Sequence, residues 1–354
     1  MQSKELKNGN AHEWPNWTSP LADMNRRGVG LGATTAELFN AAIAASAIAA
    51  FFELGLFDEL KKNDVVRVEE FCRRKDLHRP SILALLHALN CFDIVKLSAA
   101  NDAVSPGSAF AEALGDKGYF LWLVRGYGNL WQNLADLLPN GRGTMDSIGR
   151  NGKYIAMAGR DYGAHFVDTY FNDMLQQMPF KAAADIGCGS AERLINLAKA
   201  HPDFRGVGID LNPEAVKLAQ QRVAAAELQD RLTILHGDVR ALAARPELAE
   251  VELLFCFFMG HDLWPRENCL DVLRRLRTVF PRVQRFLLSD TYRSDVPPSR
   301  YVPIFTLGFE VSHAVMGQYI PSVAEWMDLF EDAGWKCVAR RDIGIPFSAI
   351  FDLR

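Results

Sequence analysis

The stretch AADIGCGSAERL (183–194) decides the fold of this chain. An apolar strand ends at Asp185, glycines follow at positions 187 and 189, and a helix is predicted to begin soon afterwards. Ala191 stands where a dinucleotide-binding fingerprint carries its third glycine. A strand, glycine turn and helix of this kind open a nucleoside-binding α/β domain, although a Gly-x-Gly pair alone also fits a purely structural turn.

The chain after residue 182 alternates between strand and helix patterns. Short apolar runs that end in polar or glycine residues predict strands, and the longer amphipathic segments between them predict helices. This alternation indicates an α/β fold with a Rossmann-like parallel sheet and helices on both faces. The predicted strands are 183–189, 206–211, 232–239, 251–258 and 285–290, and the predicted helices are 192–202, 213–228 and 266–280.

Two of the later strands end at an aspartate. Asp210 lies 25 residues after Asp185 (210 − 185), where its carboxylate is suited to accept hydrogen bonds from ribose hydroxyls. NAD-binding proteins share that feature. Asp238 ends the third strand, where its carboxylate could accept a hydrogen bond from an adenine amino group. Together with Asp185 at the glycine turn, Asp238 favours a nucleoside cofactor other than NAD.

The segments DIGCGSA (185–191), GIDL (208–211) and GDV (237–239), in this order and at this spacing, resemble the class I S-adenosylmethionine-dependent methyltransferases. Close approach of a pyrophosphate would need a third glycine at position 191, which this loop lacks. The cationic sulfonium of S-adenosylmethionine does not need it. Phe257 at the end of the fourth strand is a weaker candidate, because an apolar residue there is more often core. The cofactor residues that the resemblance implies are Asp185, Gly187, Gly189, Asp210, Leu211, Asp238 and Val239, with Phe257 added.

The segment FMGHDLWPREN (258–268) follows the fourth strand, and reactive groups in such sheets gather outside the carboxyl ends of the strands. GHDLWPRENCLDVLRRL (260–276) resembles the O-methyltransferases that carry an N-terminal winged-helix dimerisation domain. In that family the histidine is the general base, which would be His261 here, and Asp290 is the candidate for orienting it. Residues 263–267 depart from the family's pattern. A simple helix-capping role is the alternative for His261.

A subgroup with the same fold, the 2-oxo acid C-methyltransferases exemplified by phenylpyruvate C3-methyltransferase, uses a His-Asp pair and a downstream histidine as metal ligands. His313 follows His261 by 52 residues (313 − 261), which is similar to the spacing in that subgroup. The resemblance implies that His261, Asp262 and His313 hold iron, zinc or nickel, as two histidines and one carboxylate can. The implied reaction is C3 methylation of a 2-oxo acid through its enolate.

Three alternatives stay open. His313 also fits a histidine on a helix that lines the cavity, with Glu310 orienting it from one turn before. Without a metal ion, His261 would act as the general base of an O-methyltransferase. The cofactor could also be consumed in another reaction, such as intramolecular cyclisation, because its motif says nothing about the acceptor.

A 2-oxo acid also needs a cation for its carboxylate. Arg150 is the first candidate, because the subgroup carries an arginine in a similar stretch before the sheet domain, and Trp122 is expected to wall the pocket. The alternative for Arg150 is a solvated surface side chain, and other arginines in the same region compete with it. These are Arg125, Arg142 and Arg160.

The first half of the chain is predicted to be helical over 34–60, 67–77 and 79–95, with a strand pair within 93–107. Three helices and a hairpin are the components of a winged-helix module. No predicted helix is strongly basic, so a homodimerisation platform is favoured over DNA binding. The expected division is an extended or disordered arm at 1–30, a dimerisation domain at 31–118, a helical connector at 119–178 and the cofactor domain at 179–354.

The composition fits this picture. The 354 residues are 49% hydrophobic with a net charge of −4, which gives no bias toward nucleic acid or anionic membranes. The six cysteines are scattered without a Cys-x-x-Cys pair, and the polar N-terminus lacks the apolar core of a signal peptide, so a cytoplasmic location is expected. The apolar segment 38–57 is interrupted by Asn40, Ser46 and Glu53, and is expected to be a buried or dimer-forming helix rather than a membrane span.

Overall fold

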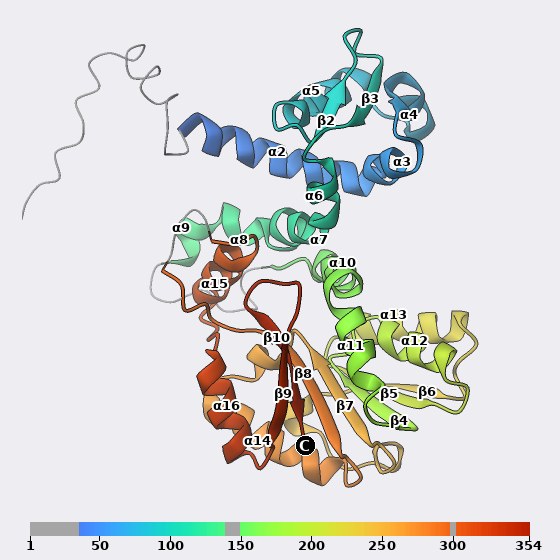
Figure 1. Cartoon of the computed structure of the whole chain (residues 1–354), viewed down its shortest axis with the longest axis vertical. Helices are drawn as coiled ribbons and strands as arrows, with labels where there is room; N and C mark the ends of the chain where they lie inside the picture. Colours follow the sequence, from blue (N-terminus) through green and yellow to red (C-terminus); the bar gives the residue numbers. More distant parts are fainter. Residues whose placement is uncertain (1–34, 139–148, 298–301) are drawn as a thin grey trace, which may run out of the picture.

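The computed structural model describes residues 35–138, 149–297 and 302–354. In Figure 1 a small N-terminal helical part lies above a large sheet, with the connecting helices α7, α8 and α10 between them. The expected arm at 1–30, Thr34 and the alternative cation Arg142 lie outside the described residues.

The N-terminal part contains the predicted helices and hairpin. The predicted first helix is divided at Gly55, whose φ of +80° is accessible mainly to glycine. Pro80 lies in the first turn of the last helix, where its missing N–H has no cost. The two-residue strand β1 was not predicted, and it completes an antiparallel sheet of order β1-β3-β2. The elements are α2 (Thr35–Leu54), α3 (Leu56–Asn63), β1 (Val66–Arg67), α4 (Val68–Lys75), α5 (Arg79–Asn90), β2 (Val95–Leu97) and β3 (Ala103–Pro106).

Helix α2 is long and apolar enough to cross a membrane by length and composition alone. Its second half packs against α5 and α7, with Ile48 and Phe51 buried in the core of the N-terminal part. Its first half is exposed, with Leu38 64% and Phe39 70% accessible. The second half is therefore a core helix, and the first half presents an apolar surface.

The connector runs through short helices that include two π-helical turns, η1 and η3. Such turns are rare and often lie at functional sites. The Tyr127 to Trp131 region follows η1, and η3 leads directly into α11. The elements are α6 (Phe110–Gly115), α7 (Lys117–Phe120), η1 (Leu121–Gly126), α8 (Gly128–Gln132), α9 (Leu134–Leu137), α10 (Gly152–Tyr162), η3 (Gly163–Val167) and α11 (Asp168–Leu175).

The large sheet has the order β6-β5-β4-β7-β8-β10-β9. The five predicted strands are present and mutually parallel, namely β4 (Ala182–Ile186), β5 (Arg205–Asp210), β6 (Leu232–His236), β7 (Leu253–Phe257) and β8 (Arg285–Thr291). Two further strands, which were not predicted, extend the sheet at one edge. There β10 (Ser348–Leu353) pairs antiparallel with β8, and β9 (Cys337–Asp342) pairs antiparallel with β10, because a short hairpin joins them.

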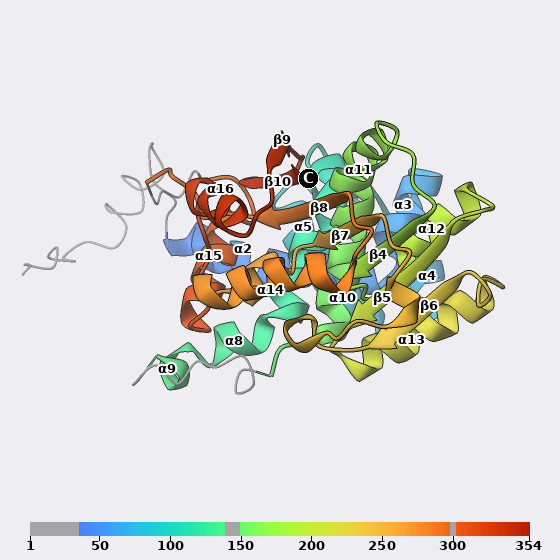
Figure 2. The same ribbon diagram turned by 90° about the horizontal axis from the view of Figure 1, so that it is seen from below.

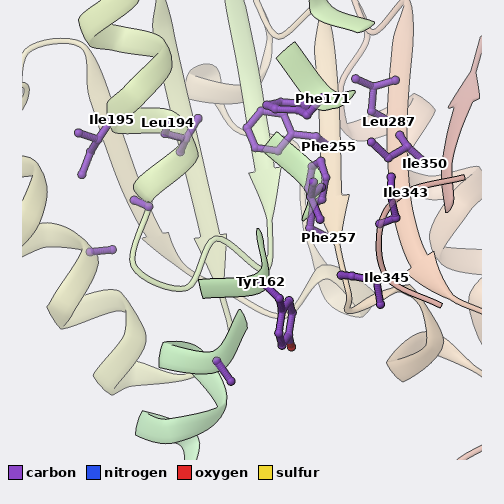
Figure 3. Packing of buried hydrophobic residues seen from close by; sticks show 14 of the residues in the cluster. Tyr162, Phe171, Leu194, Ile195, Phe255, Phe257, Leu287, Ile343, Ile345 and Ile350 are labelled. Atoms are coloured by element: carbon purple, nitrogen blue, oxygen red, sulfur yellow. The ribbon is translucent and has the colours of Figure 1, made fainter. Parts of the chain in front are cut away.

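Helices cover both faces of this sheet, as Figure 2 shows for α12 and α14 on opposite sides of β4 and β7. One core includes Phe171 of α11, whose ring lies 5.2 Å from Phe255 and 5.1 Å from Phe257, and Figure 3 shows the three rings together. The alternate residues of β7 face the other core, with α14 and α16. The covering helices are α12 (Glu192–Ala200), α13 (Pro213–Ala225), α14 (Arg266–Val279), α15 (Thr306–Val315) and α16 (Val323–Asp332).

A buried ion pair joins the antiparallel edge to the rest of the domain. Arg285 on β8 donates from Nε and Nη2 to the two carboxylate oxygens of Asp352 on β10, at 3.0 and 2.8 Å. Its Nη1 donates to the backbone carbonyl of Met174 on α11 at 2.7 Å. Arg285 and Asp352 are each 1% exposed, so one guanidinium ties two strands and a helix together in the interior.

Candidate active site

A cleft of about 1060 Å³ opens at the carboxyl ends of β4, β5, β6 and β7, with α10 on its other side. Its volume suits a nucleoside cofactor and part of a second reactant. A second cavity of about 750 Å³ lies between α11 and α12, away from the glycine turn. The large cleft is lined by every residue predicted to bind the cofactor, namely Asp185, Gly187, Gly189, Asp210, Leu211, Asp238, Val239 and Phe257.

The glycine turn has the strained backbone that its sequence suggested. Gly187 and Gly189 have φ of +76° and +51°, and Ala191, at the position of the missing third glycine, also has a positive φ of +58°. A side chain at Gly189 would meet no other atom within 4 Å, so the backbone conformation and not crowding favours glycine there. Gly187 N–H donates to the Ile209 carbonyl at 2.8 Å, which holds the turn beside the next strand.

Asp210 fastens this turn to the second strand end. One carboxylate oxygen accepts from Gly189 N–H at 2.9 Å, and the other accepts from Asn212 N–H at 2.8 Å. Asp185 is buried at the base of the turn, and burial raises the pKa of its carboxyl to about 7, with Asp210 adding to the effect and Arg193 opposing it. A cation bound in the cleft would favour the ionised carboxylate.

Asp238 has a partner that the sequence did not suggest. Its carboxylate accepts from Nε and Nη2 of Arg240 at 3.0 and 2.8 Å, and it also caps the backbone N–H of Arg240 at 2.9 Å. These bonds hold the pKa of Asp238 below its usual range. Any contact between Asp238 and an adenine amino group is therefore shared with Arg240, which lines the same cleft.

His261 is buried on the turn η6 (Gly260–Leu263), directly after β7. Its Nδ1 donates to Asp290 Oδ1 at 2.7 Å, and its backbone N–H donates to Asp290 Oδ2 at 2.6 Å. A side chain on Gly260 would come within 2.7 Å of the same carboxylate, so glycine permits this approach. Burial lowers the pKa of His261, but the charge and hydrogen bond of Asp290 outweigh it and raise the pKa to about 9. Asp290 has the contact expected of an orienting carboxylate.

His313 on α15 meets His261 across the site. The two ring centroids are 4.9 Å apart and the rings are nearly perpendicular, at 84°. Nδ1 of His313 donates to the Phe309 carbonyl at 2.6 Å, which leaves the Nε2 lone pair available in the neutral ring. Burial, together with the charge of His261, lowers the pKa of His313 well below its ordinary value. Within the described residues no side chain or carbonyl bonds to Nε2 of either ring.

The third expected ligand does not join this pair. Asp262 lines the cleft, and its carboxylate accepts a hydrogen bond from the amide of Gln318, which follows α15. Among residues 35–138, 149–297 and 302–354, no three histidine, cysteine, aspartate or glutamate side chains are grouped so that they could hold a metal ion. The proposed partner of His313 was also wrong, because Glu310 accepts from Ser294 N–H at 2.7 Å and the Phe309 carbonyl orients the ring instead.

Arg150 lines the same cleft, and its positive charge opposes the rise in the pKa of His261 and adds to the lowering of the pKa of His313. Its Nη1 donates to the hydroxyl of Tyr127 at 3.2 Å. Arg160 also lines the cleft, whereas Arg125 pairs with Glu53 away from it. Arg150 is therefore a cleft-lining cation close enough to both histidines for its charge to act on them.

Aromatic side chains surround the histidine pair on the connector side. Trp122 packs on Tyr127 with centroids 4.2 Å apart and meets Phe305 edge-on at 5.1 Å. Phe309 lies 4.0 Å from the His313 ring and 5.3 Å from the His261 ring. Trp122 was expected to form a wall of the pocket. Phe305 and Phe309 were not predicted as part of this wall, because the sequence did not indicate which side chains of the 305–315 segment point toward the site.

Comparisons with known proteins agree with this geometry. Residues 183–281 match the family model described as a methyltransferase domain. The chain is 39% identical over 329 residues to the "Methyltransferase ungE'" of Aspergillus campestris, covering 90% of this chain and 96% of that protein. It is 28% identical to the indolepyruvate C-methyltransferase of Streptomyces griseus, covering 88% and 92%. The solved structure of the mitomycin 7-O-methyltransferase superposes with a TM-score of 0.67 at 18% identity, covering 95% and 99%, which shows a shared fold.

Proposed function

Since the chain belongs to the class I S-adenosylmethionine-dependent methyltransferases and is a methyltransferase of secondary metabolism, we propose that it methylates carbon 3 of a 2-oxo acid through the enolate. The observation that carries this proposal is the pair of facing imidazoles, His261 and His313. A metal-free O-methyltransferase needs only one histidine as a base, and a second buried, neutral histidine beside it has no role in that chemistry.

The two imidazoles suit a metal ion. Each ring uses Nδ1 to donate to an oxygen, Asp290 in one case and the Phe309 carbonyl in the other, and such outer contacts fix the tautomer of ligating histidines. We assign iron, zinc or nickel to His261 and His313, and Asp262 would have to turn from Gln318 toward the two rings to serve as the third ligand, because the three side chains are not grouped in this structure. A bound ion would supply Lewis-acid polarisation of the 2-oxo carbonyl.

The chain's own residues then position the reactants. Arg150 binds the substrate carboxylate, and the aromatic wall formed by Trp122, Tyr127, Phe305 and Phe309 excludes water from the reacting carbon. The 2-oxo acid enters as its enolate, having already lost the carbon 3 proton to bulk water, and the enolate carbon bonds to the cofactor's methyl carbon. The sulfur–methyl bond breaks and its electron pair stays on sulfur, which gives S-adenosylhomocysteine. Asp185 faces the cationic cofactor. Holding both reactants in line supplies much of the acceleration.

The relatives support the substrate class. The name of the Streptomyces griseus relative contains a 2-oxo acid, and the match extends through the N-terminal part as well as the cofactor domain. Arg150 and Asp262 line the cleft together with the cofactor residues, and the charge of Arg150 acts on both histidines, so we expect the acceptor to bind between Arg150 and the histidine pair.

The second candidate is O-methylation with His261 as the general base. The contact between His261 and Asp290 favours it, because a carboxylate that orients an imidazole is the usual companion of such a base. The raised pKa of about 9 does not separate the two candidates, because an imidazole that holds both protons can neither accept another nor bind a metal ion. The second buried imidazole, His313, is what favours the first candidate.

We also propose that the N-terminal part is a winged-helix dimerisation domain and that the enzyme is a cytoplasmic homodimer. The exposed apolar side chains on the first half of α2, which include Leu38, Phe39 and Ile43, support a partner surface there. Sedimentation of the full chain over a range of concentrations would test the dimer.

The experiment that tests the reaction is product analysis with ¹³C-methyl-labelled cofactor. The wild-type enzyme is incubated with phenylpyruvate, with indolepyruvate and with a set of phenols, and the methylated product is examined by NMR. A methyl group on carbon 3 couples to the proton left on that carbon, whereas an O-methyl group shows no such coupling. Labelled methyl on carbon of a 2-oxo acid is the expected result, and transfer to phenol oxygen alone would overturn the proposal.

A further inference from the structure

Three side chains from three elements meet where α2 passes the connector. Arg125 of η1 directs Nε to Glu53 Oε2 of α2 at 2.8 Å, and its Nη2 donates to the hydroxyl of Tyr154 of α10 at 2.9 Å. The Tyr154 hydroxyl donates in turn to the Glu53 carboxylate. Each member of this Glu53–Arg125–Tyr154 cluster therefore contacts both others, although Glu53 and Tyr154 are 101 residues apart.

The cluster is only partly shielded, because the Arg125 side chain is 45% exposed. Tyr154 is 9% exposed, and the Glu53 side chain is 27% exposed. The Arg125 guanidinium lies over the Tyr154 ring, 4.7 Å from its centroid. An exposed pair contributes little to stability, but a buried hydroxyl with a fixed donor and a fixed acceptor defines a geometry. Loss of the carboxylate would leave the phenol without its acceptor and the guanidinium without its counter-charge.

The opposite side of η1 forms the wall of the acceptor pocket. Trp122, on the same turn as Arg125, packs on Tyr127 and Phe305. The backbone of the turn is also linked to Arg150, because Asn151 N–H donates to the Gly126 carbonyl at 3.0 Å and Arg150 donates to the Tyr127 hydroxyl. A π-helical turn is less regularly bonded than an α-helix, so its position depends on its neighbours.

We propose that Glu53 is a positioning residue for the acceptor: through Arg125 and Tyr154 it fixes η1 and the start of α10, and thereby Trp122, Tyr127 and Arg150. The inference rests on the proposed function, because the acceptor pocket is the one assigned to the 2-oxo acid. It makes the N-terminal helix part of the substrate-binding apparatus, although Glu53 touches neither reactant.

The test compares Glu53→Gln and Tyr154→Phe with the matched control Glu59→Gln. Glu59 pairs with Arg74 inside the N-terminal part, and its side chain is 25% exposed, close to the 27% of Glu53. The expected result is an acceptor KM raised about tenfold in Glu53→Gln and Tyr154→Phe, with kcat and the cofactor Kd within about twofold of wild type, as a shift in positioning residues would give. Glu59→Gln keeps the wild-type values. An equal rise in both KM and cofactor Kd, or no difference from the control, would overturn the proposal.

A second measurement needs no acceptor. Hydrogen exchange is followed on the cofactor-bound protein, in peptides that cover 121–127 and 152–162. These amides should exchange faster in Glu53→Gln than in wild type or Glu59→Gln, and unchanged exchange contradicts the inference. If the wild-type enzyme fails to methylate any 2-oxo acid while the exchange difference is present, the proposed function fails and the positioning role of Glu53 stands.

Discussion

The imidazole of His261 lies edge-on to that of His313, with ring centroids 4.9 Å apart, and each ring is fixed through Nδ1 by a different strand or helix. The two pKa values move in opposite directions, because Asp290 supplies a negative charge to one ring and the other has only a carbonyl. The pair therefore offers one cationic and one neutral imidazole in the absence of a bound ion. This asymmetry leads to the first prediction.

Replacing Asp290 with Asn should lower the pKa of His261 from about 9, because burial remains and the opposing charge is lost. In the wild-type protein the raised pKa of His261 stabilises the fold below pH 6.5, and this stabilisation is lost as the pH rises through about 9. The Asp290→Asn variant should not show this pH dependence of stability. Activity should fall by about 10–100-fold, as for other orienting partners. NMR titration of the imidazole in the metal-free protein checks the shift, and an unchanged titration would refute the assignment.

Cofactor binding should strengthen as the pH rises through about 7. Asp185 is neutral below that pH and ionised above it, and only the ionised form attracts the cationic cofactor. Asp185→Asn should abolish this pH dependence and weaken binding by ~10–100-fold, since a hydrogen bond to a charged group contributes ~1.5–3 kcal/mol. Isothermal titration calorimetry at several pH values measures both effects, and a pH-independent wild-type Kd would contradict the prediction.

Without cofactor, the same aspartate should cost stability at neutral pH. The folded protein keeps the Asp185 proton up to about pH 7, whereas the unfolded chain loses it near 3.8, so stability should fall between these values as the pH rises. Asp185→Asn should then raise the Tm of the cofactor-free protein at pH 8. Differential scanning calorimetry tests this, with Tm at pH 4 as the internal control, where little change is expected.

Arg150→Met should raise the KM for the 2-oxo acid by ~10–100-fold and leave the cofactor Kd nearly unchanged, because the lost contact is a charge-assisted bond to the substrate carboxylate. Arg160→Met is the matched control, since Arg160 lines the same cleft from α10. Steady-state kinetics with both substrates varied separates the two effects. Equal losses in the two variants would remove Arg150 from its assigned role.

Arg285→Met should destabilise the fold by about 3 kcal/mol, because the buried Asp352 loses its two hydrogen bonds from Arg285 and keeps only the 3.3 Å contact with Arg354. The double variant Arg285→Met, Asp352→Leu should recover much of this loss, since no charge remains in the interior. Urea unfolding followed by fluorescence measures both. A loss below about 1 kcal/mol in the single variant would show that water or another group solvates Asp352.

Much of the cofactor domain could be predicted from the sequence because its signals are local. The glycine turn at 187–189 and the aspartates that end β4 and β5 each report on their own strand. The antiparallel edge was missed because β9 is mostly exposed and its polar sequence, CVARRD, lacks an apolar run.

The histidine pair was expected from the resemblance to the 2-oxo acid C-methyltransferases, but the hydrogen-bond partners around it were not. Arg240 and Phe309 are local partners, two and four residues from Asp238 and His313, but the residue types alone did not indicate these bonds. Gln318 lies 56 residues from Asp262 and reaches it only through the packing of separate elements. The same holds for the Glu53–Arg125–Tyr154 cluster, whose members come from three distant segments. Non-local contacts of this kind follow only from the assembled fold.

The measurement that tests the central claim most directly is the metal content of the purified, chelator-free protein, compared with His313→Ala and with the surface control His201→Ala. The account predicts about one equivalent of iron, zinc or nickel in wild type and in His201→Ala, and a large loss in His313→Ala, as removal of one of three ligands requires. Absence of a transition metal from all three proteins, with methyl transfer to a hydroxyl intact, would contradict it and make His261 a general base.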